Sequence, residues 1–184
     1  SLGMALVKEI TGKNVIGYID NKAATTVVIG AHYDHLGMGD ENSLWTGEKA
    51  IHNGADDNAS GVSVMLELAH WLSKHPKGTK GHNYLFIGFS GEEKGLLGSN
   101  HFTKNPTIPL TSIAYMINMD MVGRLNDSTH GLTIGGYGTS PVWGEQLSAN
   151  DKYLKIDWIL DEKEFIISEK DNQLPSFENI FKLG

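Results

Sequence analysis

Short apolar runs that predict β-strands recur along the chain, separated by segments of helical periodicity. Residues 14–19 and 25–29 are rich in β-branched side chains and flank a short polar segment, a pattern typical of two strands joined as a hairpin. Residues 84–89 and 113–119 are continuous apolar runs, which predict buried strands. Residues 132–136 predict one more strand, which is rich in glycine.

Three segments between these runs predict helices. Residues 62–72 carry apolar side chains at the spacing i, i+3, i+4, i+7; residues 57–60 offer capping side chains before them, and His75-Pro76 marks the end. Residues 92–102 predict a second helix with acidic residues in its first turn, where the helix dipole favours them. Residues 141–150 predict a third helix that opens with proline.

This order of elements predicts an α/β fold, a layered sheet with helices on both faces. The 184 residues, of which 40% are hydrophobic, are enough for one domain with a substantial core, and no repeat or linker divides them. We therefore expect a single domain over residues 1–184. Within it, residues 155–184 form an atypical C-terminal tail, charged and weakly periodic.

Composition and charge narrow the classes of partner. The formal net charge is −7 and no dense Lys/Arg block occurs, which disfavours nucleic acid and anionic membrane surfaces and favours a peptide or other small molecule. There is no cysteine, so neither a disulfide nor a thiolate zinc site can form. The apolar stretches are shorter than the ~20 residues that a membrane helix requires.

Imidazole and carboxylate groups follow three of the predicted strands. His32 and Asp34 follow the second strand, Glu92 and Glu93 the third, and Asp120 the fourth. Ligands of open α/β sheets bind beyond the carboxyl ends of the strands, so we expect these side chains to converge on one edge. Imidazole with carboxylate, in the absence of thiolate, is the ligand mix of zinc or a similar metal that acts as a hydrolytic catalyst.

Each of these groups also has a purely structural interpretation. A His-x-Asp sequence can be a hydrogen-bonded pair, Asp57 of the Asp56-Asp57 pair can cap a helix, and Glu92-Glu93 can match a helix dipole. Carboxylates at three strand ends in one small domain nevertheless favour a shared metal centre. Other catalytic motifs fail: Ser90 stands in an incomplete G-x-S-x-G sequence and is interpreted as a turn residue, and neither a P-loop nor H-E-x-x-H occurs.

Four motifs occur in a family-like order: GAHYD at residues 30–34, NGADDNASG at 53–61, FSGEEKGLLGS at 89–99 and NMDMVG at 118–123. Together they resemble the dizinc aminopeptidases of the bacterial leucyl aminopeptidase type, whose relatives include glutamate carboxypeptidase and glutaminyl cyclase. The resemblance covers about residues 8–154. It implies a three-layer αβα zinc-exopeptidase fold with a mixed, mainly parallel central sheet, here without the last elements of the family.

The resemblance also implies a role for each matching residue. His32 and Asp120 would hold one zinc, Glu93 would hold a second, Asp56 would bridge them, Glu92 would be the general base, and Asp34 would fix the His32 tautomer. The chemistry is consistent with these roles, because two zincs ~3.5–4 Å apart activate a water whose proton needs a nearby carboxylate.

One family ligand has no counterpart. The resemblance implies a late histidine for the second zinc, but the last histidine is His130, and residues 171–173, followed by Phe177, contain no imidazole. We therefore expect one tightly held zinc. Three explanations are open: a diverged or truncated tail with impaired hydrolysis, which we favour; substitution by His130 or His52; or completion by a neighbouring chain. The other histidines, His35 among them, are expected to be solvated or structurally satisfied.

The sequence thus predicts a metallo-aminopeptidase that removes N-terminal residues from peptides, with activity impaired in this chain. The alternative is a non-catalytic metal-binding or peptide-binding domain of the same fold, and a glutaminyl-cyclase-like acyltransferase ranks last. An open sheet edge predicts self-pairing into an oligomer. The resemblance favours a secreted or periplasmic protein, although residues 1–4 do not begin a leader sequence.

Overall fold

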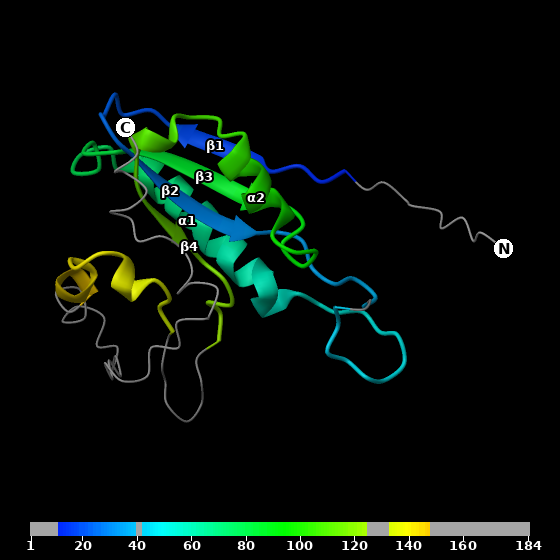
Figure 1. The fold of residues 1–184 in the computed structure, drawn as a ribbon. Coiled ribbons are helices and arrows are strands. Elements are labelled where there is room, and N and C mark those ends of the chain that lie inside the picture. The colour runs from blue at the N-terminus through cyan, green and yellow to red at the C-terminus, as the bar shows by residue number, and fades with distance from the viewer. Residues whose placement is uncertain (1–10, 40–41, 125–132, 148–184) are drawn as a thin grey trace. The chain divides into compact units, whose positions relative to one another are not determined.

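The computed structural model describes residues 11–39, 42–124 and 133–147 (Figure 1). They belong to two compact units, residues 1–124 and residues 125–184, which are described separately. The atypical tail predicted over 155–184 lies outside the described residues, and the single domain over 1–184 stays a prediction.

The first unit is built on a mixed sheet of four strands in the order β1-β3-β2-β4. The strands are β1 (Val15–Ile19), β2 (Thr26–His32), β3 (Asn83–Phe89) and β4 (Ile113–Asn118). β2 pairs in parallel with both β3 and β4, and β1 pairs antiparallel with β3. The predicted mixed, mainly parallel sheet is therefore confirmed.

The predicted hairpin of the first two strands is wrong, because β3 lies between β1 and β2. The segment that connects β1 to β2 passes the start of β3 and is fixed there by one side chain. Asn83 Oδ1 accepts hydrogen bonds from the backbone N–H groups of Asn21 at 3.0 Å and Ala23 at 3.1 Å. This long-range contact replaces the direct pairing of β1 with β2.

Helices cover both faces of the sheet, as Figure 1 shows for α1 (Gly61–Lys74) and α2 (Leu97–Lys104). Alternate residues of β2 point to opposite faces. On one face Val27, Ile29 and Ala31 pack with Met65 and Leu72 of α1. On the other face Val28 packs with Leu85, Ile87 and Phe89 of β3 and with Phe102 of α2. The fold is thus the predicted three-layer αβα arrangement.

The second helix begins later than predicted. α2 starts at Leu97, whereas the sequence predicted a start at Glu92. Residues 92–96 form a turn instead, in which the carbonyl of Glu92 accepts hydrogen bonds from the N–H groups of Gly95 and Leu96, both at 2.9 Å. The two adjacent glutamates therefore lie in the turn that follows β3, before the helix.

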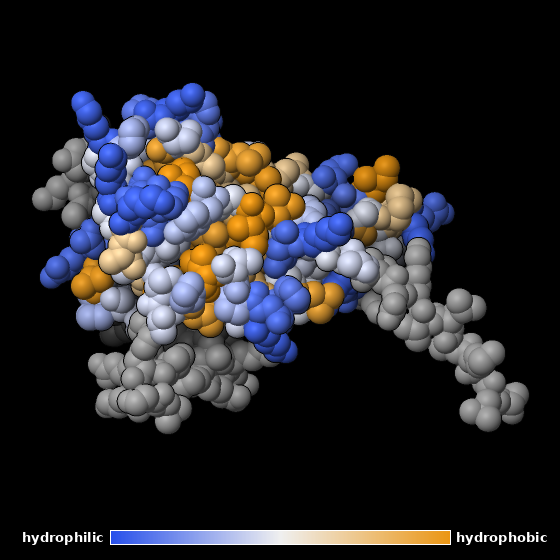
Figure 2. Space-filling view, turned by 90° about the horizontal axis from the view of Figure 1, so that it is seen from above, coloured by the Kyte–Doolittle hydropathy of each residue, from blue (hydrophilic) through white to orange (hydrophobic). Residues whose placement is uncertain are grey.

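The strand β4 forms one edge of the described sheet and follows a short 3-10 turn, η2 (Leu110–Ser112). The sequence predicted a buried strand, but Tyr115, Met116 and Ile117 are exposed in this edge strand of the described sheet. Figure 2, which views the molecule from above, shows apolar side chains gathered in a band on that side of the surface. Oligomerisation through the sheet edge stays a prediction.

In the second unit, residues 133–136 are not a strand, contrary to the sequence prediction for this part of 132–136. A 3-10 turn, η3 (Tyr137–Thr139), follows, and residues 143–147 are helical, as predicted. Among the described residues of the chain, no helix combines the length and apolar character needed to cross a membrane.

Candidate metal centre

The carboxyl end of β2 carries the most buried histidine of the site. His32 is the last residue of β2 and is 2% exposed. Its Nε2 lies 3.1 Å from Asp57 Oδ1 and 3.3 Å from Asp120 Oδ1. Asp120 follows the end of β4, and Asp57 lies in a short irregular turn, η1 (Ala55–Ser60), before α1. His32, Asp57 and Asp120 form one group of side chains that could hold a metal ion.

A second such group adjoins the first. It consists of His35, Asp57 and Glu93, so Asp57 belongs to both groups. His35 Nδ1 lies 2.7 Å from Glu93 Oε1 and 3.9 Å from Asp57 Oδ1. Sequence reasoning assigned no role to His35. The available signal was its position three residues after His32, beyond the end of the same strand.

The structure places Asp57, and not Asp56, between the two groups, so the shared position moves to Asp57. Asp56 is occupied elsewhere: its Oδ1 accepts a hydrogen bond from Gly123 N–H at 2.8 Å, and its carbonyl accepts one from Ser60 Oγ at 2.6 Å. Ser60 Oγ in turn accepts from Val122 N–H at 3.1 Å. Asp56 therefore ties the turn before α1 to the segment after β4.

The buried side chain of Asn58 fixes the same two segments more firmly. Asn58 Nδ2 donates to the carbonyl of Met119 at 3.0 Å, while its Oδ1 accepts from Gly61 N–H at 3.1 Å and Met121 N–H at 3.3 Å. Residue 61 must be small here, because an added Cβ would lie 2.5 Å from the Met119 carbonyl oxygen. Asp57 directly precedes Asn58, and Asp120 lies between Met119 and Met121. The hydrogen bonds of Asn58 therefore hold both aspartates close to His32.

Asp34 positions the turn that carries the glutamates. Its Oδ1 accepts a hydrogen bond from Glu92 N–H at 3.0 Å and its Oδ2 from Glu93 N–H at 3.2 Å. His32 Nδ1 bonds the backbone carbonyl of Asp34 at 3.1 Å, whereas the Asp34 carboxylate is 3.7 Å away. A carbonyl only accepts, so Nδ1 carries the proton and Nε2 is free to ligate. The carbonyl of Asp34, rather than the predicted carboxylate, thus makes the closer contact with the ring.

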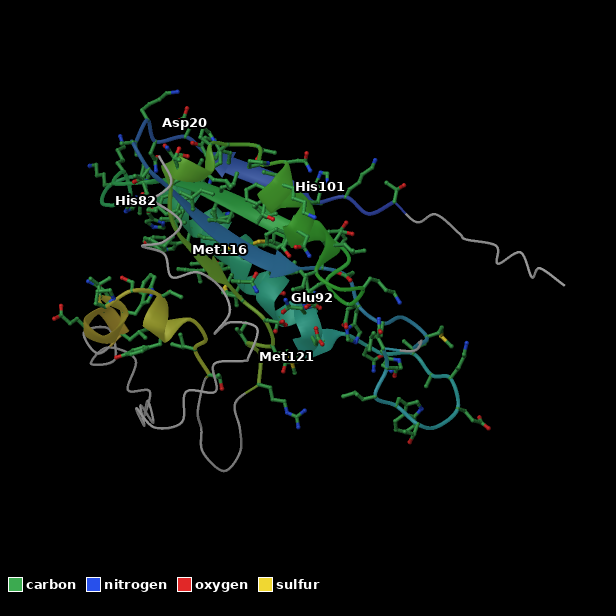
Figure 3. The ribbon with its side chains drawn as sticks, in the orientation of Figure 1. Asp20, His82, Glu92, His101, Met116 and Met121 are labelled. Atoms are coloured by element: carbon green, nitrogen blue, oxygen red, sulfur yellow. The ribbon has the colours of Figure 1, made fainter. Side chains whose placement is uncertain are left out.

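Glu92 lies beside the carboxyl end of β2, whereas Asp20 and His82 lie at the opposite end of the sheet (Figure 3). Glu92 lines a cavity of about 170 Å³ together with His32, Asp120 and the apolar side chains of Phe89, Leu96 and Met116. Burial raises the pKa of the Glu92 carboxyl above its ordinary 4.5, and the charges of neighbouring carboxylates add to this, against the opposing charge of His32. Such a shift suits a carboxylate that must accept a proton near neutral pH.

His52, one of the two histidines considered for the missing ligand, does not enter either group. His52 Nδ1 bonds the carbonyl of Ala50 at 3.0 Å, and its Nε2 bonds Ser43 Oγ at 2.6 Å. Both ring nitrogens of His52 are thereby engaged within its own loop. His130, residues 171–173 and Phe177 lie outside the described residues.

The donor atoms fit zinc. Each group offers imidazole nitrogen and carboxylate oxygen, and its ligand atoms lie within 4.8 Å of one another. Ligands ~2.0–2.2 Å from a tetrahedral zinc would be roughly 3.4 Å apart, close to the separations around His32 Nε2. His35 Nδ1 and Glu93 Oε1 are buried and lie 2.7 Å from each other, and neither makes a hydrogen bond to a further group in the described structure.

Comparison with known proteins agrees with this arrangement. The model of peptidase family M28 matches residues 14–173. The chain belongs to peptidase family M28. A probable leucine aminopeptidase from Trichophyton verrucosum is 36% identical over 65% of this chain and 32% of its own length. Aminopeptidase YwaD from Bacillus subtilis is 32% identical over 77% of this chain and 29% of its own length. The chain thus spans about a third of these M28 relatives.

Solved structures show the same M28 fold. A Zn-dependent exopeptidase from Parabacteroides distasonis has a TM-score of 0.61 and 25% identity, covering 77% of this chain and 51% of that chain. A glutaminyl cyclase from Porphyromonas gingivalis has a TM-score of 0.63 and 23% identity, covering 78% of this chain and 51% of that chain. The likeness to the cyclase shows the fold alone.

Zinc affinity at His32 is expected to fall as the pH falls, because Nε2 must be free of its proton to ligate. Burial lowers the pKa of His32, but the charges of Asp120 and Glu92, with the Asp34 carbonyl and Asp57, outweigh it and raise the pKa above 6.5. Protons should therefore compete with zinc even above pH 6.5. Isothermal titration with zinc from about pH 5.5 to about pH 8.5 should show affinity rising across this range. Constant affinity would contradict the assignment of His32 as a ligand.

Proposed function

We propose that this chain carries the catalytic centre of a zinc-dependent aminopeptidase that hydrolyses N-terminal residues from peptides. One observation supports the proposal above all: Asp57 is shared by two ligand groups at the carboxyl edge of the sheet, with Glu92 beside them in a cavity. Paired metal positions with a neighbouring carboxylate suit the hydrolysis of an unactivated amide. The named M28 relatives include aminopeptidases, which supports the choice of substrate.

The protein residues divide the work of the reaction. His32, Asp57 and Asp120 would hold a zinc ion, which would supply polarisation of the scissile carbonyl and a lower pKa for the attacking water. Glu92 takes the proton of that water and returns it to the leaving amine, a role that its raised pKa favours. Asp34 aims Glu92 by accepting a hydrogen bond from its backbone N–H at 3.0 Å.

The cavity suggests what lies next to the scissile bond. Phe89, Leu96 and Met116 give one part of its wall an apolar character, whereas Glu92 and Asp120 give the other part negative charge. An apolar first side chain fits the former, and the α-ammonium group of a free N-terminus fits the latter. We therefore propose peptides with an apolar N-terminal residue as substrates.

Metal removal tests this function. Dialysis against a chelator should abolish release of the chromophore from leucyl-p-nitroanilide, because carboxylates and imidazoles alone do not activate water sufficiently, and added zinc should restore it. The same substrate with an acetylated amino group should not be cleaved, because it lacks the ammonium group. Equal cleavage of both substrates would contradict an aminopeptidase. No cleavage of either substrate by the zinc-loaded protein would favour the non-catalytic binding domain.

A further inference from the structure

We propose that Asn14 is a positioning residue of the catalytic site, because it holds both ends of residues 91–97, here called the glutamate turn. The inference deepens the proposed function and rests on it for the role of Glu92 as the base. Asn14 comes directly before β1, which pairs antiparallel with β3 so that Val15 lies opposite Gly88. This pairing brings Asn14 to the carboxyl end of β3, where the glutamate turn begins.

One carboxamide joins the two ends of the glutamate turn. Asn14 Oδ1 accepts a hydrogen bond from Ser90 N–H at 3.2 Å, and Asn14 Nδ2 donates one to the carbonyl of Gly98 at 2.8 Å. Ser90 follows the end of β3, and Gly98 lies in the first turn of α2. Because a carboxamide carries its acceptor and its donors at fixed positions, the two bonds set the separation of the two ends.

The contact is close enough to require glycine at position 98. An added Cβ on Gly98 would lie 2.4 Å from Asn14 Oδ1 and 2.4 Å from the carbonyl oxygen of Ser90. The segment that carries Asn14 is itself anchored, because Tyr33 Oη donates a hydrogen bond to the carbonyl of Lys13 at 2.6 Å. Tyr33 directly follows β2, so Asn14 is held against the end of β3 from the neighbouring strand as well.

The path of the glutamate turn depends on such restraints. Three of its residues have φ between +59° and +99°, so it follows neither a regular helix nor a strand. Asp34 binds two N–H groups in the middle of the turn, and Asn14 binds the residues that flank it. Loss of the Asn14 contacts should therefore move the Glu92 carboxylate away from its place beside His32 in the cavity.

The substitution Asn14→Ala tests the inference through its coupling to Glu92. At saturating zinc, kcat for leucyl-p-nitroanilide should fall by about 10–100-fold, as expected when a catalytic group is misplaced by about 1 Å. In the Glu92→Gln background the same substitution should change kcat by no more than about 2-fold, because the group that Asn14 positions is already inactive. An equal fall in both backgrounds would show a general structural effect and overturn the inference.

Two further variants separate the hydrogen bonds from other effects of the substitution. Asn105→Ala is the matched control, because it makes the same change at the exposed end of α2, and it should leave kcat unaltered. Asn14→Asp keeps the acceptor for Ser90 N–H but loses the donor to the Gly98 carbonyl, so it should lower kcat with almost no change in side-chain volume. Wild-type kcat in Asn14→Asp would overturn the inference. Thermal melts identify any variant that fails to fold.

Amide hydrogen exchange tests the Asn14 contacts without reference to activity. In Asn14→Ala the backbone amides of residues 90–97 should exchange faster than in the wild type, because local opening becomes easier, whereas those of α1 should keep their rates. Unchanged exchange over residues 90–97 would overturn the inference. A folded, zinc-loaded wild-type protein that hydrolyses no peptide would refute the proposed function alone, and the exchange rates would then decide whether Asn14 holds the glutamate turn.

Discussion

Replacement of Glu92 by glutamine is expected to lower kcat for leucyl-p-nitroanilide by about 10²–10⁴-fold, the usual contribution of a general base. Glutamine keeps the shape of the side chain but cannot accept the proton of the attacking water. Glu92 belongs to neither ligand group of the described residues, so zinc content should stay at the wild-type level. Steady-state kinetics and metal analysis of the same preparation measure the two effects separately.

The control for this substitution is Glu67→Gln, which makes the same chemical change on the exposed face of α1. It should leave both kcat and zinc content unaltered. Loss of zinc together with activity in Glu92→Gln would show that Glu92 is a ligand and would contradict its assignment as the base.

Local sequence patterns predicted individual elements better than their neighbours in the sheet. The apolar run at 84–89 and the helical stripe at 62–72 correspond to β3 and α1, because both patterns follow from burial of one element. The partner of β1 depended instead on contacts remote in sequence. Asn83 fixes the connection between β1 and β2, and no periodicity within either strand encodes that contact.

The start of α2 was missed for a related reason. Two adjacent glutamates suit the first turn of a helix. The opposing local signal was Gly95, which disfavours a helix and has φ +99° in the structure. In the structure both backbone N–H groups are bound by the carboxylate of Asp34, a residue from the end of β2. This tertiary contact holds Glu92 and Glu93 in a turn that directs them toward the site.

Strand ends predicted the location of the site, but spacing did not identify every residue. His32, Glu93 and Asp120 lie together because parallel strands bring their carboxyl ends to one edge. Asp56 and Asp57 differ by a single position, and their tertiary contacts separate their roles: Asp57 lies beside His32, whereas Asp56 accepts a hydrogen bond from Gly123 N–H. His35 was overlooked because a lone histidine has many structural uses, and its position beyond β2 carried the available signal.

Replacement of Asp57 by asparagine is expected to weaken both zinc positions at once, because Asp57 belongs to both ligand groups. An amide oxygen is neutral, so it compensates the metal charge less well than a carboxylate. We expect zinc affinity to fall at least about 100-fold, the most that loss of an outer partner costs, and hydrolysis to fall below detection at wild-type zinc levels. Equilibrium dialysis followed by metal analysis measures the first effect, and initial rates measure the second.

Asp56→Asn is the matched control, one residue away and identical in chemistry. Its Oδ1 can still accept the hydrogen bond that Gly123 N–H donates at 2.8 Å, so the turn before α1 should keep its position. Zinc content and hydrolysis should therefore remain close to wild type. If Asp56→Asn lost zinc while Asp57→Asn retained it, Asp56 would be the shared ligand, and the arrangement of this turn around the metal centre would have to be reversed.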